Sequence, residues 1–365
     1  MKRFIFKLVI FILPFLVVLT VELFILPIDY FTFRVWEALS VRKFKKLLTG
    51  PFYPNLELTK VEEGDLAHHT KYSKKKVVKW ITDQYGYRKI NGEGPFRIVI
   101  VGDSNIAGSG LTQKEILSEV LESQLKVRVY PMAPAGIGSF LKERRFIEKP
   151  PDLVILASVE REITYFSPLK SKRRYQIEGN LLQSIKALRE NRFFQSLFIL
   201  LDRLYKMNML HYYRANIKRW ISAKSNIKPK YIVPLHGPIF FLEGPEANRE
   251  VPREVLEKAV QLIKSYHDAV TTRGIRFLFL PIPEKENILH EILQTPKPTF
   301  LGNLIKELKR QGVEVIDTQK AFEEAFQKNQ ILPYQIDDTH WSAEGVKITA
   351  ELIRETVGGE KYTSN

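Results

Sequence analysis

The sequence predicts an α/β protein in which helices cover a central parallel sheet, with an N-terminal membrane anchor and a basic helical insertion. Three observations support this prediction. Strand and helix candidates alternate from residue 97 to residue 357, an uncharged stretch lies near the N-terminus, and cations concentrate in one block. Alternating strands and helices with short connections are typical of a parallel sheet covered on both faces.

The anchor is expected within residues 1–28. Leu8–Val21 contains no charge, and Glu22 separates it from a second apolar run, Leu23–Ile28. Together these runs are long enough to span a bilayer. Three cations precede them as in a signal sequence, but no small-residue cleavage site follows, so we expect an uncleaved anchor. Cations lie on both flanks and leave its orientation open, and an interfacial or re-entrant helix is the alternative.

Residues 29–95 are rich in aromatic and turn-forming residues and show neither helical nor strand periodicity. We expect an ordered connector that packs on the following domain. Its motif Tyr85-Gly86-Tyr87-Arg88 is most simply a structural turn. The alternative is that Tyr87 and Arg88 line a carbohydrate or acyl site.

The sheet domain is expected to comprise residues 96–165 and 231–358, with residues 359–365 as a tail. Its strands are expected at Arg97–Val101, Val127–Tyr130, Leu153–Ala157, Ile275–Leu280 and Glu314–Ile316. Its helices are expected at Thr112–Gln124, Gly138–Ile147, Val251–Arg273, Pro298–Gln311 and Ser342–Val357.

An insertion, residues 166–230, interrupts this alternation. Between Lys170 and Lys230 there are fifteen Lys and Arg residues and three acidic residues, which is most of the net charge of +15. The block contains an amphipathic helical stretch, Leu181 to Trp220, that could lie on a lipid surface, on the sheet or on a partner. Its charge suits lipid headgroups or an acidic polymer. A solvated insertion is the alternative, and nucleic acid is not expected because no binding motif accompanies the charge.

A serine follows the first strand of the domain. The β-branched run Ile98–Val101 ends in Gly102-Asp103-Ser104, and a predicted helix follows a turn that contains glycine. This layout places the Ser104 hydroxyl at the carboxyl end of a buried strand, where open α/β sheets have their ligand crevices. A serine nucleophile needs a base, and a backbone N–H at or after the serine can face a developing oxyanion.

His340 is the candidate base among seven histidines. It follows Asp337 and Asp338 and precedes a helix start. An aspartate two or three residues before a histidine can bend back to its ring and fix the tautomer, so either aspartate fits. A structural histidine is the alternative. The chain has no cysteine, and no second ligand falls at metal-binding spacing around His340, so we expect no metal and no cofactor.

These features resemble the SGNH (GDSL-type) hydrolase superfamily. Gly102-Asp103-Ser104 matches its first block, and Asp337 to His340 matches its last, Asp-x-x-His. Ala133-Pro134-Ala135-Gly136 stands where the second block supplies a glycine. The resemblance implies a three-layer, flavodoxin-like fold and an oxyanion hole formed by the N–H groups of Ser104 and Gly136.

The third block, Gly-x-Asn-Asp, is missing, and Ser158-Val159-Glu160-Arg161 stands in its place. Arg161 is therefore the candidate replacement for the absent asparagine. Asp338-Thr339-His340-Trp341 and the Glu160-Arg161 pair resemble the AlgX/AlgJ-type polysaccharide O-acetyltransferases. In that branch the aspartate directly before x-His completes the triad, which favours Asp338 over Asp337. The candidate substrate-binding residues are Asn105, Tyr87, Arg88, Glu160 and Trp341.

The resemblance implies a membrane-anchored, extracytoplasmic enzyme that moves an acetyl group through Ser104, His340 and Asp338. We expect a polysaccharide acceptor, an acyl donor and a membrane-bound acyl-transfer partner. Membrane lipid would contact the anchor and the basic insertion. The alternative, supported by the missing third block, is a catalytically silent module that binds glycan or scaffolds a synthesis complex.

Overall fold

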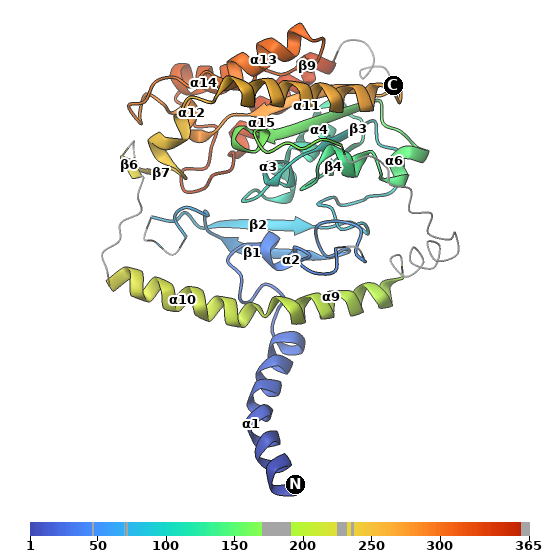
Figure 1. The fold of residues 1–365 in the computed structure, drawn as a ribbon, viewed down its shortest axis with the longest axis vertical. Coiled ribbons are helices and arrows are strands. Elements are labelled where there is room, and N and C mark those ends of the chain that lie inside the picture. The colour runs from blue at the N-terminus through green and yellow to red at the C-terminus, as the bar shows by residue number, and fades with distance from the viewer. Residues whose placement is uncertain are drawn as a thin grey trace.

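The core of the molecule is a parallel sheet of five strands in the order β4-β3-β5-β8-β9 (Figure 1). The computed structural model describes residues 1–45, 47–68, 70, 72–169, 191–224, 232–234 and 237–358. The strands are β3 Ile98–Val101, β4 Val129–Met132, β5 Leu153–Val159, β8 Arg276–Ile282 and β9 Glu314–Val315. Numbered within this sheet alone, the order is 2-1-3-4-5, which is flavodoxin-like. The predicted α/β class is confirmed.

Side chains alternate between the two faces of the sheet. In β3, Ile98 and Ile100 belong to the core on one face, and Val99 and Val101 belong to the core on the other. Helices α4, α14 and α15 cover the first face, and α11 and α13 cover the second. These helices are α4 Leu117–Leu125, α11 Arg253–Thr271, α13 Phe300–Arg310, α14 Thr318–Asn329 and α15 Ala343–Val357.

Short elements connect these layers. They are α3 Ser104–Ala107, η2 Gln113–Glu115, α5 Ile137–Phe140, α6 Arg144–Glu148, α7 Glu160–Ile163, β6 Ile232–Pro234, β7 Pro238–Phe240, η3 Gly244–Asn248 and α12 Lys285–Ile288. The five strands of the sheet begin and end within two residues of their predicted bounds. The helix expected over Gly138–Ile147 is instead two short helices, α5 and α6, and α14 was not expected.

The connector contains regular structure that its periodicity did not predict. Helix α2, Val35–Leu39, is followed by an antiparallel hairpin of β1, Glu57–Glu62, and β2, Lys76–Ile81. In β2 only Val78 and Trp80 are buried, between Lys, Val and Ile side chains that are exposed or half-buried. Both join the core cluster that contains Ile100 of the sheet. The connector therefore shares its core with the sheet domain.

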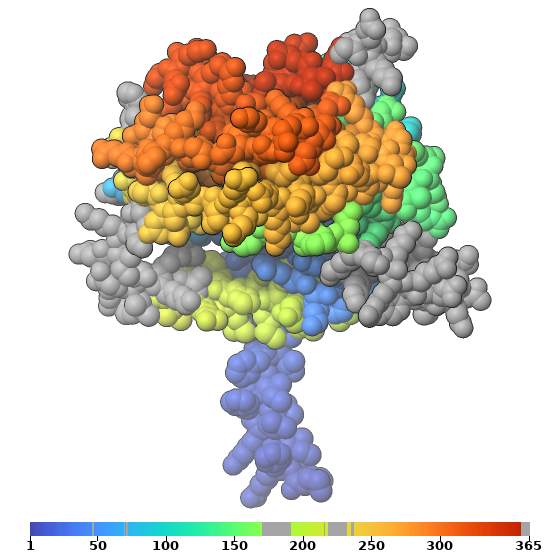
Figure 2. Space-filling model, turned by 45° about the horizontal axis from the view of Figure 1, so that its top comes forward, coloured from blue at the N-terminus to red at the C-terminus, as the bar shows by residue number. Residues whose placement is uncertain are grey.

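Helix α1, Lys2–Thr20, extends away from the body and continues into a π-helical turn, η1, Val21–Ile25 (Figures 1 and 2). No side chain of α1 is buried. Within the described part of the chain, this continuous helix, Lys2–Ile25, is the one long and apolar enough to cross a membrane, with a mean hydropathy of 2.9. Such a helix fits either a membrane anchor or a signal sequence.

The described part of the basic insertion forms two helices, α9 Arg192–Lys206 and α10 Asn208–Lys224. The prediction of a single helix over Leu181 to Trp220 is therefore wrong. The helix is interrupted at Met207, which has a left-handed backbone conformation with φ of 46°. Residues 181–190 of that prediction, and the tail 359–365, lie outside the described residues.

Candidate active site

Ser104 lies where the carboxyl end of β3 passes into α3. Asp103 caps this short helix, because its Oδ1 accepts the Asn105 N–H at 2.8 Å. Its Oδ2 accepts the N–H of Val159, at the end of β5, also at 2.8 Å. A Cβ on Gly102 would lie 2.5 Å from Ile106 Cγ1, so the turn requires glycine there. Asp103 thus ties together the ends of two neighbouring strands, on either side of the point where the strand order reverses.

His340 reaches Ser104 from the loop before α15. Its Nε2 lies 2.8 Å from Ser104 Oγ, and its Nδ1 lies 2.5 Å from Asp338 Oδ1. Asp337, the other candidate, faces elsewhere: its Oδ2 accepts the N–H groups of Lys74 at 2.7 Å and Gly64 at 3.3 Å. Of the two aspartates, the structure therefore places Asp338 beside the histidine.

Asp338 is held as a carboxylate. Burial alone would raise its pKa, but the charge and hydrogen bond of His340 hold the pKa well below the usual range. An ionised Asp338 keeps the ring proton on Nδ1 of His340, so Nε2 can accept the hydrogen bond of the Ser104 hydroxyl. The arrangement gives the serine a base with the correct tautomer.

Two residues that the sequence did not single out support the histidine loop. Asp65, from the connector, accepts the Thr339 N–H at 3.0 Å and its hydroxyl at 2.8 Å. Burial, followed by the charge of Asp338, raises the pKa of Asp65. Lys285 is buried, and its Nζ donates to the carbonyl oxygens of Gln335 and Asp338, both at 2.6 Å. Burial lowers the pKa of this lysine to about 8.

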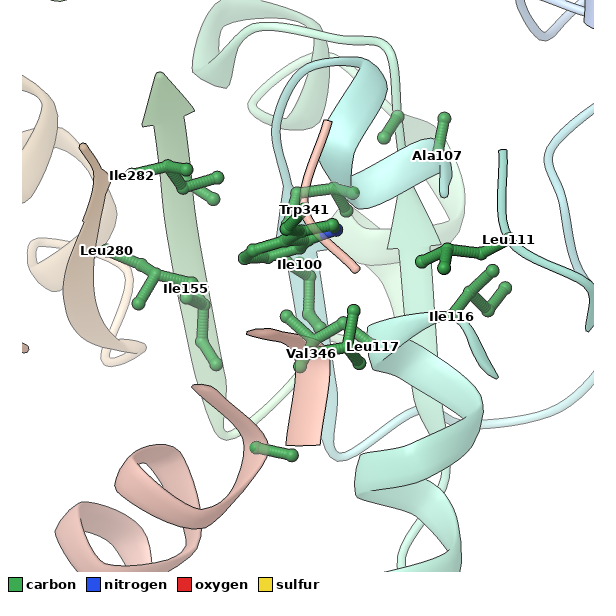
Figure 3. Close-up of a cluster of buried hydrophobic side chains, with 14 of the residues drawn as sticks. Ile100, Ala107, Leu111, Ile116, Leu117, Ile155, Leu280, Ile282, Trp341 and Val346 are labelled. Carbon is green, nitrogen blue, oxygen red and sulfur yellow. The ribbon is translucent and has the colours of Figure 1, made fainter. Parts of the chain in front are cut away.

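Trp341 and Asn105, two of the candidate substrate-binding residues, fix the two loops to each other. Both side chains are buried. The Trp341 indole N–H donates to the Asn105 carbonyl oxygen at 3.1 Å, and its backbone N–H donates to Asn105 Oδ1 at 3.3 Å. Figure 3 shows Trp341 among apolar side chains of the sheet such as Ile100, Ile155 and Ile282. Because Trp341 is held in this core, it fixes the position of the neighbouring His340.

The other candidate substrate contacts, Tyr87, Arg88 and Glu160, also bond or pack within the protein. Arg88 is fully buried and donates to the carbonyl oxygens of Gly108 at 2.6 Å and Leu111 at 2.7 Å, so it holds the turn after α3. Tyr87 is buried with its ring edge-on to Tyr130. Glu160 Oε2 accepts from Asn287 at 2.8 Å. The guanidinium of Arg88 and Oε2 of Glu160 are thus occupied within the protein.

A cavity of about 660 Å³ opens beside Ser104. Gly136 lies in its wall, and a Cβ there would meet nothing within 4 Å, so open space lies next to its backbone. Other lining residues are Trp36, Gly102, Asp103, Ser139, Lys142, Ser158, Glu162, Tyr165 and Tyr266. Sequence reasoning missed most of these, and Trp36 could not have been found, because α2 brings it from the connector.

Arg161, the candidate replacement for the missing asparagine, pairs with a carboxylate. Its Nη1 donates to both carboxylate oxygens of Glu284, at 2.6 and 2.8 Å, and among the described residues it is not part of the cavity wall. Ser158, three residues earlier at the end of β5, lines the cavity instead. Glu162 does so too, and burial, followed by the charge of Asp103, raises its pKa.

Three groups at the site could offer ligand atoms to a metal ion. Atoms of Asp65, Asp338 and His340 lie within 4.8 Å of one another. However, Nδ1 of His340 is already bonded to Asp338, and both oxygens of Asp65 accept from Thr339. A metal ion would have to break these hydrogen bonds, so the donor set fits a hydrogen-bonded triad better than a metal centre.

Comparisons with known proteins bear on the family. Residues 240–364 match the family model described as an SGNH hydrolase-like domain, acetyltransferase AlgX. This match includes the loop with Asp338 and His340 but not Ser104. No curated protein matches the chain.

Several solved structures are similar to this chain. A member of the lipolytic protein G-D-S-L family from Veillonella parvula has 10% identity and a TM-score of 0.38, over 72% of this chain and 98% of that chain. A catalytic mutant of the acetylxylan esterase Axe2 from Geobacillus stearothermophilus has 13% identity and a TM-score of 0.36, over 75% and 99%. The match of residues 240–364 confirms the resemblance predicted from the sequence: this part of the chain is similar to the SGNH hydrolase-like domain of AlgX acetyltransferases.

Proposed function

We propose that this protein is a membrane-anchored serine acyltransferase or esterase that adds or removes acetyl groups on a cell-surface or exported polysaccharide. The hydrogen-bonded series Ser104–His340–Asp338 carries the proposal. A silent glycan-binding module would have no chemical reason to keep these three groups in contact beside a cavity. The acetyltransferase description of the matched family supports acyl chemistry.

In the proposed reaction, His340 Nε2 takes the proton of Ser104 Oγ while that oxygen attacks the carbonyl carbon of an acetyl ester. The N–H groups of Ser104 and Gly136 stabilise the negative oxygen of the tetrahedral intermediate. Its collapse releases the donor alcohol, which takes the proton from His340, and leaves an acetyl ester on Ser104. A sugar hydroxyl or water then attacks this ester by the same steps and frees the serine. Asp338 stabilises the imidazolium in both halves.

The walls of the cavity support a carbohydrate acceptor. Trp36 and Tyr165 supply flat apolar surfaces, and Lys142 and Glu162 supply charged groups that can bond hydroxyls. A volume of about 660 Å³ accommodates a sugar unit together with an acetyl group.

Helix α1 supports the membrane location. Its side chains are free of the protein body, and the helix is long enough to cross the hydrocarbon core. We place the catalytic domain on the extracytoplasmic side because an exported or cell-surface glycan is found on that side of the membrane.

The test uses the full-length protein in detergent with a chromogenic acetyl ester, with and without an oligosaccharide acceptor. Ser104→Ala is expected to lower kcat/KM by about 10³-fold or more, because no other group can form the acyl-enzyme. The matched control, Ser265→Ala, removes an exposed hydroxyl on α11 that bonds its own helix and should leave the rate unchanged. Equal rates for wild type and Ser104→Ala under both conditions would exclude the proposed enzymatic activity of Ser104.

A further inference from the structure

Helices α9 and α10 form a bar across the base of the body, beside the end of α1 (Figure 1). Hydrogen bonds join the bar to the end of α1. The Arg203 guanidinium donates to the carbonyl oxygens of Glu22 at 2.8 Å and Leu23 at 2.9 Å. The Met209 N–H donates to Glu22 Oε1 at 3.3 Å. These bonds therefore fix the position of the bar relative to the apolar helix.

The fully buried side chains of α9 are polar, and beside them only Phe198 and Ile199 pack, partly buried, on the core. Asp202 is fully buried and accepts the N–H of Lys43 at 2.7 Å and the hydroxyl of Tyr53 at 2.7 Å. Lys206 is buried too, and its Nζ donates to the Ala38 carbonyl oxygen at 2.8 Å. A water-exposed helix normally has the reverse arrangement, with its apolar stripe toward the core.

The opposite face of the bar is apolar and exposed. On α9, Phe193 is 72%, Leu197 38% and Tyr205 57% exposed, and on α10 Ile217 is 60% exposed. Large apolar side chains exposed along a helix mark a candidate site of contact with a membrane or another protein. The exposed apolar side chains of α9 thus face away from the sheet domain.

The position of the bar favours lipid as the occupant. If α1 crosses a bilayer, as the proposed function requires, the surface of that bilayer lies at the end of α1, where the bar is attached. Aromatic side chains such as Phe193, Tyr205 and Tyr213 on a helix in this plane match the composition of membrane interfaces. We propose that α9 and α10 lie in the interfacial layer of the membrane that α1 spans, and hold the catalytic domain against it.

The absence of native cysteine makes the proposal directly testable. Single-cysteine variants Leu197→Cys and Ile217→Cys of the full chain are labelled with an environment-sensitive fluorophore. They are reconstituted into phosphatidylcholine–phosphatidylglycerol vesicles, with or without bromine on the acyl chains. Phe15→Cys in α1 is the reference for the bilayer interior. Asn303→Cys on α13, an exposed position at the other end of the molecule, is the reference for water.

The labels at 197 and 217 are expected to be quenched by brominated lipid, as at 15, while the label at 303 is unaffected. Quenching at 15 without quenching at 197 and 217 would overturn the proposal and leave the anchor intact. No quenching at 15 would overturn the anchor and this inference with it. If 197 and 217 are unquenched by lipid yet shielded from iodide, and dilution in detergent exposes them, a second copy covers the bar and the proposal is wrong.

Discussion

Asp337 and Asp338 are neighbours in the chain with different partners. The first accepts backbone N–H groups of the connector, and the second lies 2.5 Å from the histidine that faces Ser104. Both lie in the turn before α15, where the chain changes direction, so two adjacent carboxylates reach different parts of the molecule.

Replacing each aspartate by asparagine distinguishes these roles. Asp338→Asn is expected to lower kcat by about 10²–10⁴-fold, because an amide cannot hold the Nδ1 tautomer or stabilise the imidazolium. Asp337→Asn keeps an acceptor oxygen for Lys74 and Gly64 and should retain kcat close to wild type. Steady-state kinetics on an acetyl ester measures both. The account is contradicted if Asp337→Asn causes the larger loss.

Residues in short local motifs were the ones the sequence could predict. Ser104 follows a β-branched run, and His340 follows two acids before a helix start, so both stand out without knowledge of the fold. Asp65 and Trp36 could not be found this way, because folding brings them from the connector to the site. The motif at Tyr87 and Arg88 left a structural turn and a ligand site both open, because the distant carbonyl groups that accept from the Arg88 guanidinium are not visible in the motif itself.

At the scale of elements, strands that are buried on both faces were predictable and the hairpin was not. Uniformly apolar runs such as Leu153–Ala157 have only one plausible location, inside a covered parallel sheet. The hairpin strands β1 and β2 are short and interleave Lys, Thr and Glu with apolar residues, so no sustained period shows. Helix α9 was also hard to place from the sequence, because the side chains that it buries most deeply are polar.

The inward attachment of α9 depends on Asp202. Burial would raise its pKa, but backbone N–H donors of the connector hold the pKa below its ordinary value of 3.8. Asp202→Asn is expected to lower the free energy of unfolding by about 1.5–3 kcal/mol at pH 7, because charged hydrogen bonds are lost. Since the folded pKa is depressed, this contribution is present above pH 3.8 and disappears as the pH falls through the folded value.

Urea unfolding of the full chain in detergent, at pH 7 and at decreasing pH, measures this difference. Asp268→Asn is the matched control, because Asp268 lies in an exposed ion pair on α11 and contributes little. Equal stability of wild type and Asp202→Asn at pH 7 would show that the carboxylate does not hold α9 in place.

At the scale of the whole molecule, the parts follow one another outward from α1. The bar of α9 and α10 comes first, then the connector hairpin, then the covered sheet with Ser104 (Figure 1). The connector supplies Asp65 to the histidine loop and Trp36 to the cavity wall. The candidate site is therefore assembled from both layers, and removing the connector would remove part of this site as well as part of the core.

If Ser104 carries the acetyl group during turnover, the mass of the protein must increase by that group. Full-length protein is mixed with an excess of an activated acetyl ester, quenched in acid and measured intact and after digestion. The account predicts a gain of one acetyl group on the peptide that contains Ser104, absent from Ser104→Ala and removed when an oligosaccharide acceptor or time for hydrolysis is given. Turnover without any acetyl on Ser104, or with the same acetyl group on Ser104→Ala, would contradict it.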